Sequence, residues 1–83
     1  MKISVEISMY PLSETYKPLI KAFIERLKTY KEVVVEVNNM STQIFGDYST
    51  VFDILKKEIK EEFHKGDKII YVMKLINTNL QKS

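Results

Sequence analysis

Few side chains in this 83-residue chain have the types and spacing that catalysis needs. There is no cysteine, which excludes a thiolate metal site and a thiol nucleophile. The one histidine, His64, precedes Lys65 and Gly66 near the expected end of a helix, where the helix dipole favours an imidazole in solvent. A single histidine in that place argues against a Ser-His-Asp triad, and two glycines cannot make a glycine-rich phosphate loop.

The most unusual stretch runs from Asn38 to Gly46 and contains an expected strand that begins Ser-Thr-Gln. If Ile44 faces the helices, Thr42 does too, because side chains alternate along a strand. Ser41 and Gln43 then point to the opposite face. One interpretation is simply that threonine is a good strand former that can bond the backbone locally. The other is that these hydroxyl and amide groups, with Tyr10 nearby, line a pocket for a flat polar ligand.

The carboxylates form two groups with different expected roles. Glu58, Glu61 and Glu62 alternate with lysines, which is typical of a solvated helix face with i,i+4 ion pairs. Glu6 and Glu36 are expected on the same sheet face, but two carboxylates are a weak case for a metal site. We therefore expect a protein that is not an enzyme and has no cofactor.

Hydrophobic periodicity predicts the elements that position these residues. Alternation over residues 3–10 predicts a strand whose buried side chains are Ile3, Val5, Ile7 and Met9. A helix is expected from about Thr15 to Thr29, and strands at 33–37, 41–45 and 69–76. Asn38-Asn39 is expected as the turn between the middle strands, and Gly46-Asp47 as the break that ends the second of them. Asp47 or Ser49 would cap a second helix, and Gly66 would follow its last turn.

The expected inner stripes of the two helices carry large apolar side chains. For the first helix they are Tyr16, Leu19, Ile20, Phe23, Ile24 and Leu27; for the second, Val51, Ile54, Leu55, Ile59 and Phe63, with Phe52 beside them. The order βαββαβ predicts one α+β domain over residues 1–76, a ferredoxin-like sandwich, followed by a polar tail over 77–83. Two helices cover one face of a four-stranded antiparallel sheet. We call the other the open face.

The open face is expected to mix apolar and polar side chains: Ser4, Glu6, Ser8, Tyr10, Val34, Glu36, Asn38, Ser41, Gln43, Phe45, Ile70, Val72, Lys74 and Ile76. Strand rise and spacing give this face a plan area of roughly 400 Å². A partly apolar face of that size is larger than scattered surface hydrophobics and favours association with a partner. A half-polar, fully solvated face is the alternative. Lys74 could neutralise one of the carboxylates there.

Charge and hydropathy narrow the class of partner. A net charge of +2, with signs alternating along the helices, gives no basic stripe for nucleic acid. No apolar run approaches the roughly 20 residues of a membrane span, and Glu6 comes too early for a signal sequence. The expected location is the cytoplasm.

Two segments carry a family resemblance that covers nearly the whole chain. Ser8-Met9-Tyr10-Pro11-Leu12 and Asn39-Met40-Ser41-Thr42-Gln43-Ile44-Phe45-Gly46-Asp47, which leads into Val51-Phe52-Asp53-Ile54, resemble the YkoF-type thiamin/hydroxymethylpyrimidine-binding proteins. The resemblance implies a ferredoxin-like domain that pairs with another copy through its sheet, as a homodimer or homotetramer. It also implies non-catalytic binding of thiamin or its pyrimidine, in vitamin uptake or salvage.

The resemblance places the ligand near the Tyr-Pro and Ser-Thr segments. Matched motifs suggest Tyr10, Ser41 and Thr42 as ligand-binding residues. The chemistry of a cationic thiazolium and an aminopyrimidine adds Glu6, Glu36, Asn38, Gln43 and Phe45. Two other functions remain open: a protein-interaction module that pairs through its open face, and an enzyme in which Glu6 or Glu36 is the acid or base.

Overall fold

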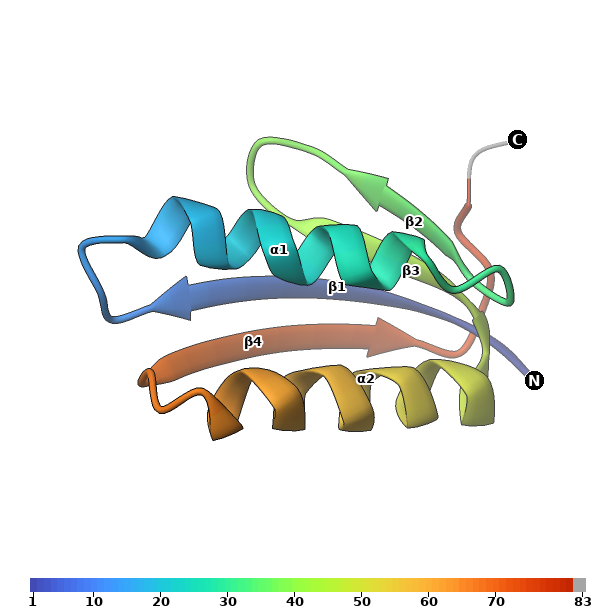
Figure 1. Ribbon diagram of the computed structural model, residues 1–83. Coiled ribbons are helices and arrows are strands. Elements are labelled where there is room, and N and C mark those ends of the chain that lie inside the picture. The colour runs from blue at the N-terminus through green and yellow to red at the C-terminus, as the bar shows by residue number, and fades with distance from the viewer. Residues whose placement is uncertain (82–83) are drawn as a thin grey trace.

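The computed structural model describes residues 1–81 and contains a single four-stranded sheet with two helices on one side (Figure 1). The elements in order are β1 (Lys2–Pro11), α1 (Tyr16–Lys28), β2 (Val34–Val37), β3 (Thr42–Asp47), α2 (Tyr48–His64) and β4 (Ile69–Ile76). Neighbouring strands are antiparallel and lie in the order β2-β3-β1-β4. The predicted ferredoxin-like βαββαβ fold is confirmed.

β1 is a central strand, and its alternation defines the core. Its four odd-numbered apolar residues, predicted to be buried, have exposed fractions between 1% and 8%. They pack against Phe23 and Leu27 of α1, Val51, Ile54 and Leu55 of α2, and Ile44 of β3. The core therefore fills the single layer between the sheet and the helices.

Three aromatic side chains of the helices lie outside the core, although Tyr16 and Phe63 were predicted to lie on the inner stripes and Phe52 beside the second stripe. Tyr16, Phe52 and Phe63 are 44%, 36% and 51% exposed. In α2 the buried stripe is Val51, Ile54, Leu55, Glu58 and Glu62. Phe52 and Phe63 lie on its flank, one position out of register with that stripe, beside Met73 of β4.

Gly46 does not break β3, contrary to the prediction. The strand continues through Asp47, and Gly46 pairs with Ile3. A Cβ atom built at Gly46 would lie 2.9 Å from Val33 Cγ1 and 3.2 Å from Val51 Cγ2. The glycine therefore permits a close approach of α2 to the sheet. Gly66, by contrast, has φ +92° just after α2, as predicted for a helix-terminating glycine.

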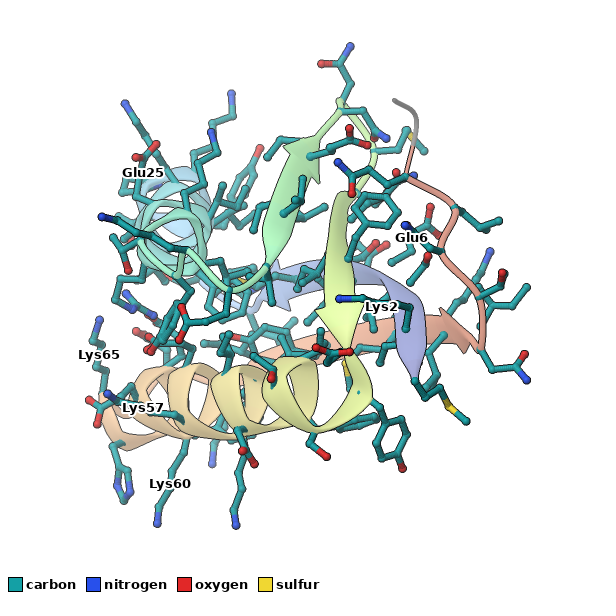
Figure 2. The ribbon with its side chains drawn as sticks, turned by 90° about the vertical axis from the view of Figure 1, so that its right-hand side faces the viewer. Lys2, Glu6, Glu25, Lys57, Lys60 and Lys65 are labelled. Atoms are coloured by element: carbon teal, nitrogen blue, oxygen red, sulfur yellow. The ribbon has the colours of Figure 1, made fainter. Side chains whose placement is uncertain are left out.

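The open face is less bare than expected at one end. After β4 the chain turns back, so that residues 77–81 run along the side of the sheet away from the helices (Figures 1 and 2). Ser4 Oγ on β1 donates a hydrogen bond to the Thr78 carbonyl oxygen and accepts one from the Leu80 amide. The predicted polar tail thus includes a docked segment, and its residues 82–83 lie outside the described residues. Neither helix within residues 1–81 is long and apolar enough to cross a membrane.

Candidate functional site

The strand register aligns the open-face side chains in rows that cross the whole sheet. Glu6 lies opposite Lys74 on one side and Gln43 on the other, and Gln43 lies opposite Glu36. The next row along the strands is Ile76, Ser4, Phe45 and Val34. Directly opposed side chains in antiparallel strands have Cβ atoms about 5 Å apart. A charged and amide row therefore lies immediately beside a largely apolar row.

A groove of about 940 Å³ follows these two rows. Its lining is Ser4, Val5, Glu6, Glu36, Val37, Asn38, Gln43, Phe45, Lys74, Leu75, Ile76 and Leu80. Five of the eight predicted ligand-binding residues are among them: Glu6, Glu36, Asn38, Gln43 and Phe45. Its volume lies within the range of small-molecule sites, and its lining combines apolar walls with a few polar groups.

Glu6 is already engaged within the groove. Its Oε2 accepts a hydrogen bond from Ser41 Oγ at 3.1 Å, and its Oε1 lies 3.7 Å from Lys74 Nζ. Figure 2 shows Glu6 on the sheet side that faces the C-terminal segment, away from the helices. Lys74 therefore neutralises one of the two carboxylates, as the sequence suggested.

Glu36 is the second carboxylate of the row, on the edge strand β2. Glu36 is half-buried, and it forms no ion pair with any of residues 1–81. Asn38, at the end of the same strand, has a structural role instead. Its Oδ1 accepts hydrogen bonds from the amides of Met40 and Ser41, which closes the β2–β3 turn. Only its side-chain amide nitrogen is left to face a ligand.

The other three predicted residues are outside the groove lining, although Ser41 contacts the groove through its hydrogen bond to Glu6. Tyr10 and Thr42, with Ser41 and Asn38, line a smaller recess of about 140 Å³ between the end of β1, α1 and the β2–β3 turn. Thr42 is 5% exposed and pairs with Ile7, which confirms that it faces the helix layer. Tyr10 lies opposite Ile70 and is 52% exposed. The predicted set is thus split between two recesses that share Asn38.

A buried charge cluster between the helices was missed by the sequence analysis. Glu58 and Glu62, predicted to be solvated, are 5% and 0% exposed. Arg26 of α1 donates to both, through Nε to Glu58 Oε1 at 2.7 Å and through Nη2 to Glu62 Oε1. The Tyr30 hydroxyl donates to Glu58 Oε2, and Lys65 Nζ lies 3.2 Å from Glu62 Oε1.

Helical spacing was the signal that could have identified this cluster. Glu58 follows the buried Leu55 by three residues and Glu62 follows Glu58 by four, so both lie on the buried stripe of α2. Arg26 lies three residues after the buried Phe23. The residue types suggested solvent exposure, whereas the spacing indicated burial.

The cluster shifts the pKa values of Glu58 and Tyr30. Burial alone would raise the pKa of Glu58, but hydrogen bonds from Tyr30 and Arg26, and the Arg26 charge, hold it below its usual value. The hydrogen bond to Glu58, helped by burial, raises the pKa of Tyr30 to about 12. At neutral pH Glu58 is therefore charged and Tyr30 is neutral. The cluster is therefore an interhelix brace, in which Arg26 joins two carboxylates of α2.

Within residues 1–81 no three histidine or acidic side chains gather as a metal site. The open-face groove offers one paired carboxylate, one carboxylate without an ion pair, an amide and an aromatic ring. These groups suit non-covalent recognition of a polar or cationic organic molecule.

Fold and groove define a ferredoxin-like α+β domain with a recess on its open sheet face. The model of the YKOF-related family matches residues 2–78, and the chain belongs to that family. A search of curated protein sequences finds no significant match.

Solved structures share the fold at low sequence identity. A Streptococcus pneumoniae protein superposes with a TM-score of 0.84 and 22% identity, over 96% of this chain and 90% of its own. A Thermotoga maritima protein, assigned provisionally to thiamine biosynthesis or salvage, superposes with a TM-score of 0.82 and 18% identity, over 94% of this chain and 85% of its own. A hypothetical protein from Methanocaldococcus superposes with a TM-score of 0.78 and 24% identity, over 98% of this chain and 84% of its own. These likenesses support the fold alone.

Proposed function

We propose that this protein binds thiamin or its hydroxymethylpyrimidine part in the open-face groove, without catalysing a reaction on it. The observation that carries the proposal is the row Lys74, Glu6, Gln43 and Glu36 at the floor of a groove that also contains Phe45. Family membership and the provisional role of the Thermotoga maritima protein support the choice of ligand.

The groove chemistry fits a molecule with a cationic ring and a hydrogen-bonding ring. An aminopyrimidine presents donor and acceptor nitrogens, which the Gln43 amide can match with its own acceptor and donors. A thiazolium carries a permanent positive charge, for which Glu36 and the Phe45 ring are suitable partners. The groove is large enough to hold both rings.

A binding role agrees with what the site contains. Among the groove residues only Glu6, Glu36 and Lys74 titrate, and Glu6 and Lys74 are engaged with each other. Glu36 is the one carboxylate of the groove lining without an ion pair, so these residues offer no second free acid or base to act beside it. We propose a role in vitamin uptake or salvage in the cytoplasm.

Isothermal titration calorimetry with thiamin and with the free hydroxymethylpyrimidine tests the proposal. We expect saturable heat from at least one of them, and loss of that heat in Gln43→Ala. The matched control is Asn39→Ala, which removes another exposed amide side chain outside the groove lining. No heat and no thermal shift at millimolar concentrations of either compound would refute the proposal.

Self-association through the open face is a second candidate function. Val34, Ile70, Val72 and Ile76 on that face are each 40–51% exposed, an apolar surface that a second copy could cover. We propose a homodimer or homotetramer on this basis. Sedimentation of the wild type and of Val72→Glu tests it: we expect the wild type to be larger than a 9.8 kDa monomer and the variant to dissociate. A wild type that sediments as a monomer at a protein concentration of about 100 micromolar would contradict self-association.

A further inference from the structure

The C-terminal segment is fixed to the open face through one hydroxyl group. Ser4 Oγ donates to the Thr78 carbonyl oxygen at 2.7 Å and accepts from the Leu80 amide at 2.8 Å. Ser4 is 7% exposed although it lies on the face without helices. A serine hydroxyl can donate and accept at once, so this single side chain holds the segment on both sides of Asn79.

The segment brings Leu80 into the lining of the groove. Phe45 is 5% exposed, whereas its row neighbours Val34 and Ile76 are 40% and 44% exposed. Leu80 itself lines the groove and is 59% exposed. The segment therefore narrows one end of the groove beside Phe45, yet leaves most of the Leu80 side chain uncovered.

The carboxylate of Glu36 on β2 lies near Phe45. Phe45 lies opposite Val34, so Glu36 is its diagonal neighbour, roughly 7–8 Å away by strand geometry. Glu6 is compensated by Lys74 and Ser41. The groove thus has an apolar end near Phe45 and Leu80, and an anionic position at Glu36.

We propose that residues 77–81 form a wall of the ligand site, with Leu80 contacting an aromatic ring of the ligand and Glu36 selecting a positive charge. Ser4 is the positioning residue, because it holds Leu80 in place and touches no ligand itself. The inference rests on the proposed function and makes it more specific: the ligand is a flat organic cation, so thiamin is preferred over the neutral hydroxymethylpyrimidine.

Three single variants and one double variant of the full chain test the proposal by calorimetry, with thiamin and the hydroxymethylpyrimidine as probes. Leu80→Ala should weaken thiamin binding about three- to tenfold, because part of an apolar contact is lost. Ser4→Ala should have a similar effect, and the double variant should lose little more, since both changes act through one segment. Glu36→Gln should weaken thiamin about tenfold and leave the pyrimidine unchanged.

Matched controls use residues of the same type outside the groove lining. Leu12→Ala changes another exposed leucine, and Ser8→Ala another open-face serine of β1. Glu25→Gln removes a charge on the outer side of α1 (Figure 2). All three should bind both probes as the wild type does, at unchanged melting temperature.

The outcomes separate this inference from the function on which it rests. If the wild type binds neither probe, the proposed function is wrong. If it binds thiamin but Leu80→Ala and Ser4→Ala bind equally well, the wall is refuted while the function stands. Equal loss of both probes in Glu36→Gln would refute selection by charge. If Ser4→Ala fails to fold, Leu80→Ala alone tests the wall, because truncating the exposed Leu80 side chain should leave the fold intact.

Discussion

Replacing Arg26 with methionine tests whether the interhelix charge cluster holds the helices together. The change keeps an unbranched side chain but leaves Glu58 and Glu62, which are 5% and 0% exposed, without their shared cation. Removing one partner of a buried ion pair typically costs 3–5 kcal/mol. The Arg26 side chain is 31% exposed and Lys65 still reaches Glu62, so we expect the lower end, about 3 kcal/mol. For a domain of this size that corresponds to a fall in Tm of roughly 12–24 °C.

Urea denaturation followed by circular dichroism measures this loss. Lys28→Met, an exposed lysine at the end of the same helix, is the matched control and should change stability by less than about 0.5 kcal/mol. Adding Glu58→Gln and Glu62→Met to Arg26→Met should restore most of the loss, because the uncompensated charges are removed with it. A loss in Arg26→Met no larger than in Lys28→Met would show that solvent screens the cluster.

The pH dependence of the same variant provides a second check. Because the pKa of Glu58 is lower in the folded state than its usual 4.5, its contribution is present above pH 4.5 and is lost as pH falls through the folded value. The wild type should therefore lose stability on acidification below about pH 5. In Arg26→Met burial dominates and favours the protonated carboxyl, so that loss should shrink or reverse. Parallel stability curves for the two proteins would refute this explanation.

Three further changes have expected outcomes that follow from local geometry. Gly46→Ala should lower stability by roughly 1–3 kcal/mol in urea denaturation, because its Cβ meets two valine side chains at 2.9 and 3.2 Å; an unchanged midpoint would mean that α2 can shift outward. Gly66→Ala should cost about 1 kcal/mol, and Gly66→Asn less, because φ is +92° with open space around the Cβ position; equal losses would point to a steric cause. The wild type should lose stability as pH rises from 10 towards 12, since the pKa of Tyr30 is raised to about 12 and its contribution is complete only below pH 10. Tyr30→Phe should show a shallower alkaline loss, and the same slope in both would argue against the Glu58 hydrogen bond.

Periodicity predicted the fold because β1 and both helices each bury one stripe of side chains, although β2 and β4 are largely exposed. The alternation of β1 alone identified the core residues that contact both helices, and β4 has the predicted bounds. The errors arose where residue type and spacing disagreed. Glutamates were assigned to solvent by type, although Glu58 and Glu62 had core spacing. Phe63 was assigned to the core by type, although its position is on the flank of α2.

The groove was only partly predictable for a different reason. Strand parity placed Glu6, Glu36 and Gln43 on one face, and the antiparallel register then aligned them in a row. The docked segment depends on a contact between Ser4 and Leu80, which are 76 residues apart in sequence. No local pattern encodes such a contact, since a serine in a strand and a short polar tail have no preferred partner. The groove lies towards the end of β1 opposite Tyr10, whereas the predicted site near Tyr10 and Thr42 corresponds to the smaller recess.

The separation of the brace from the groove makes the binding predictions interpretable. The core lies between the helices and the sheet and the Arg26 cluster joins the two helices, whereas Glu36, Lys74 and Leu80 lie on the other face and are half-buried or exposed. Substituting such residues usually changes stability by less than about 0.5 kcal/mol. A loss of binding in Glu36→Gln or Leu80→Ala should therefore come without a loss of folding. A coupled fall in melting temperature would instead mean that the C-terminal segment is part of the stabilising structure, and that Ser4 serves the fold before it serves a ligand.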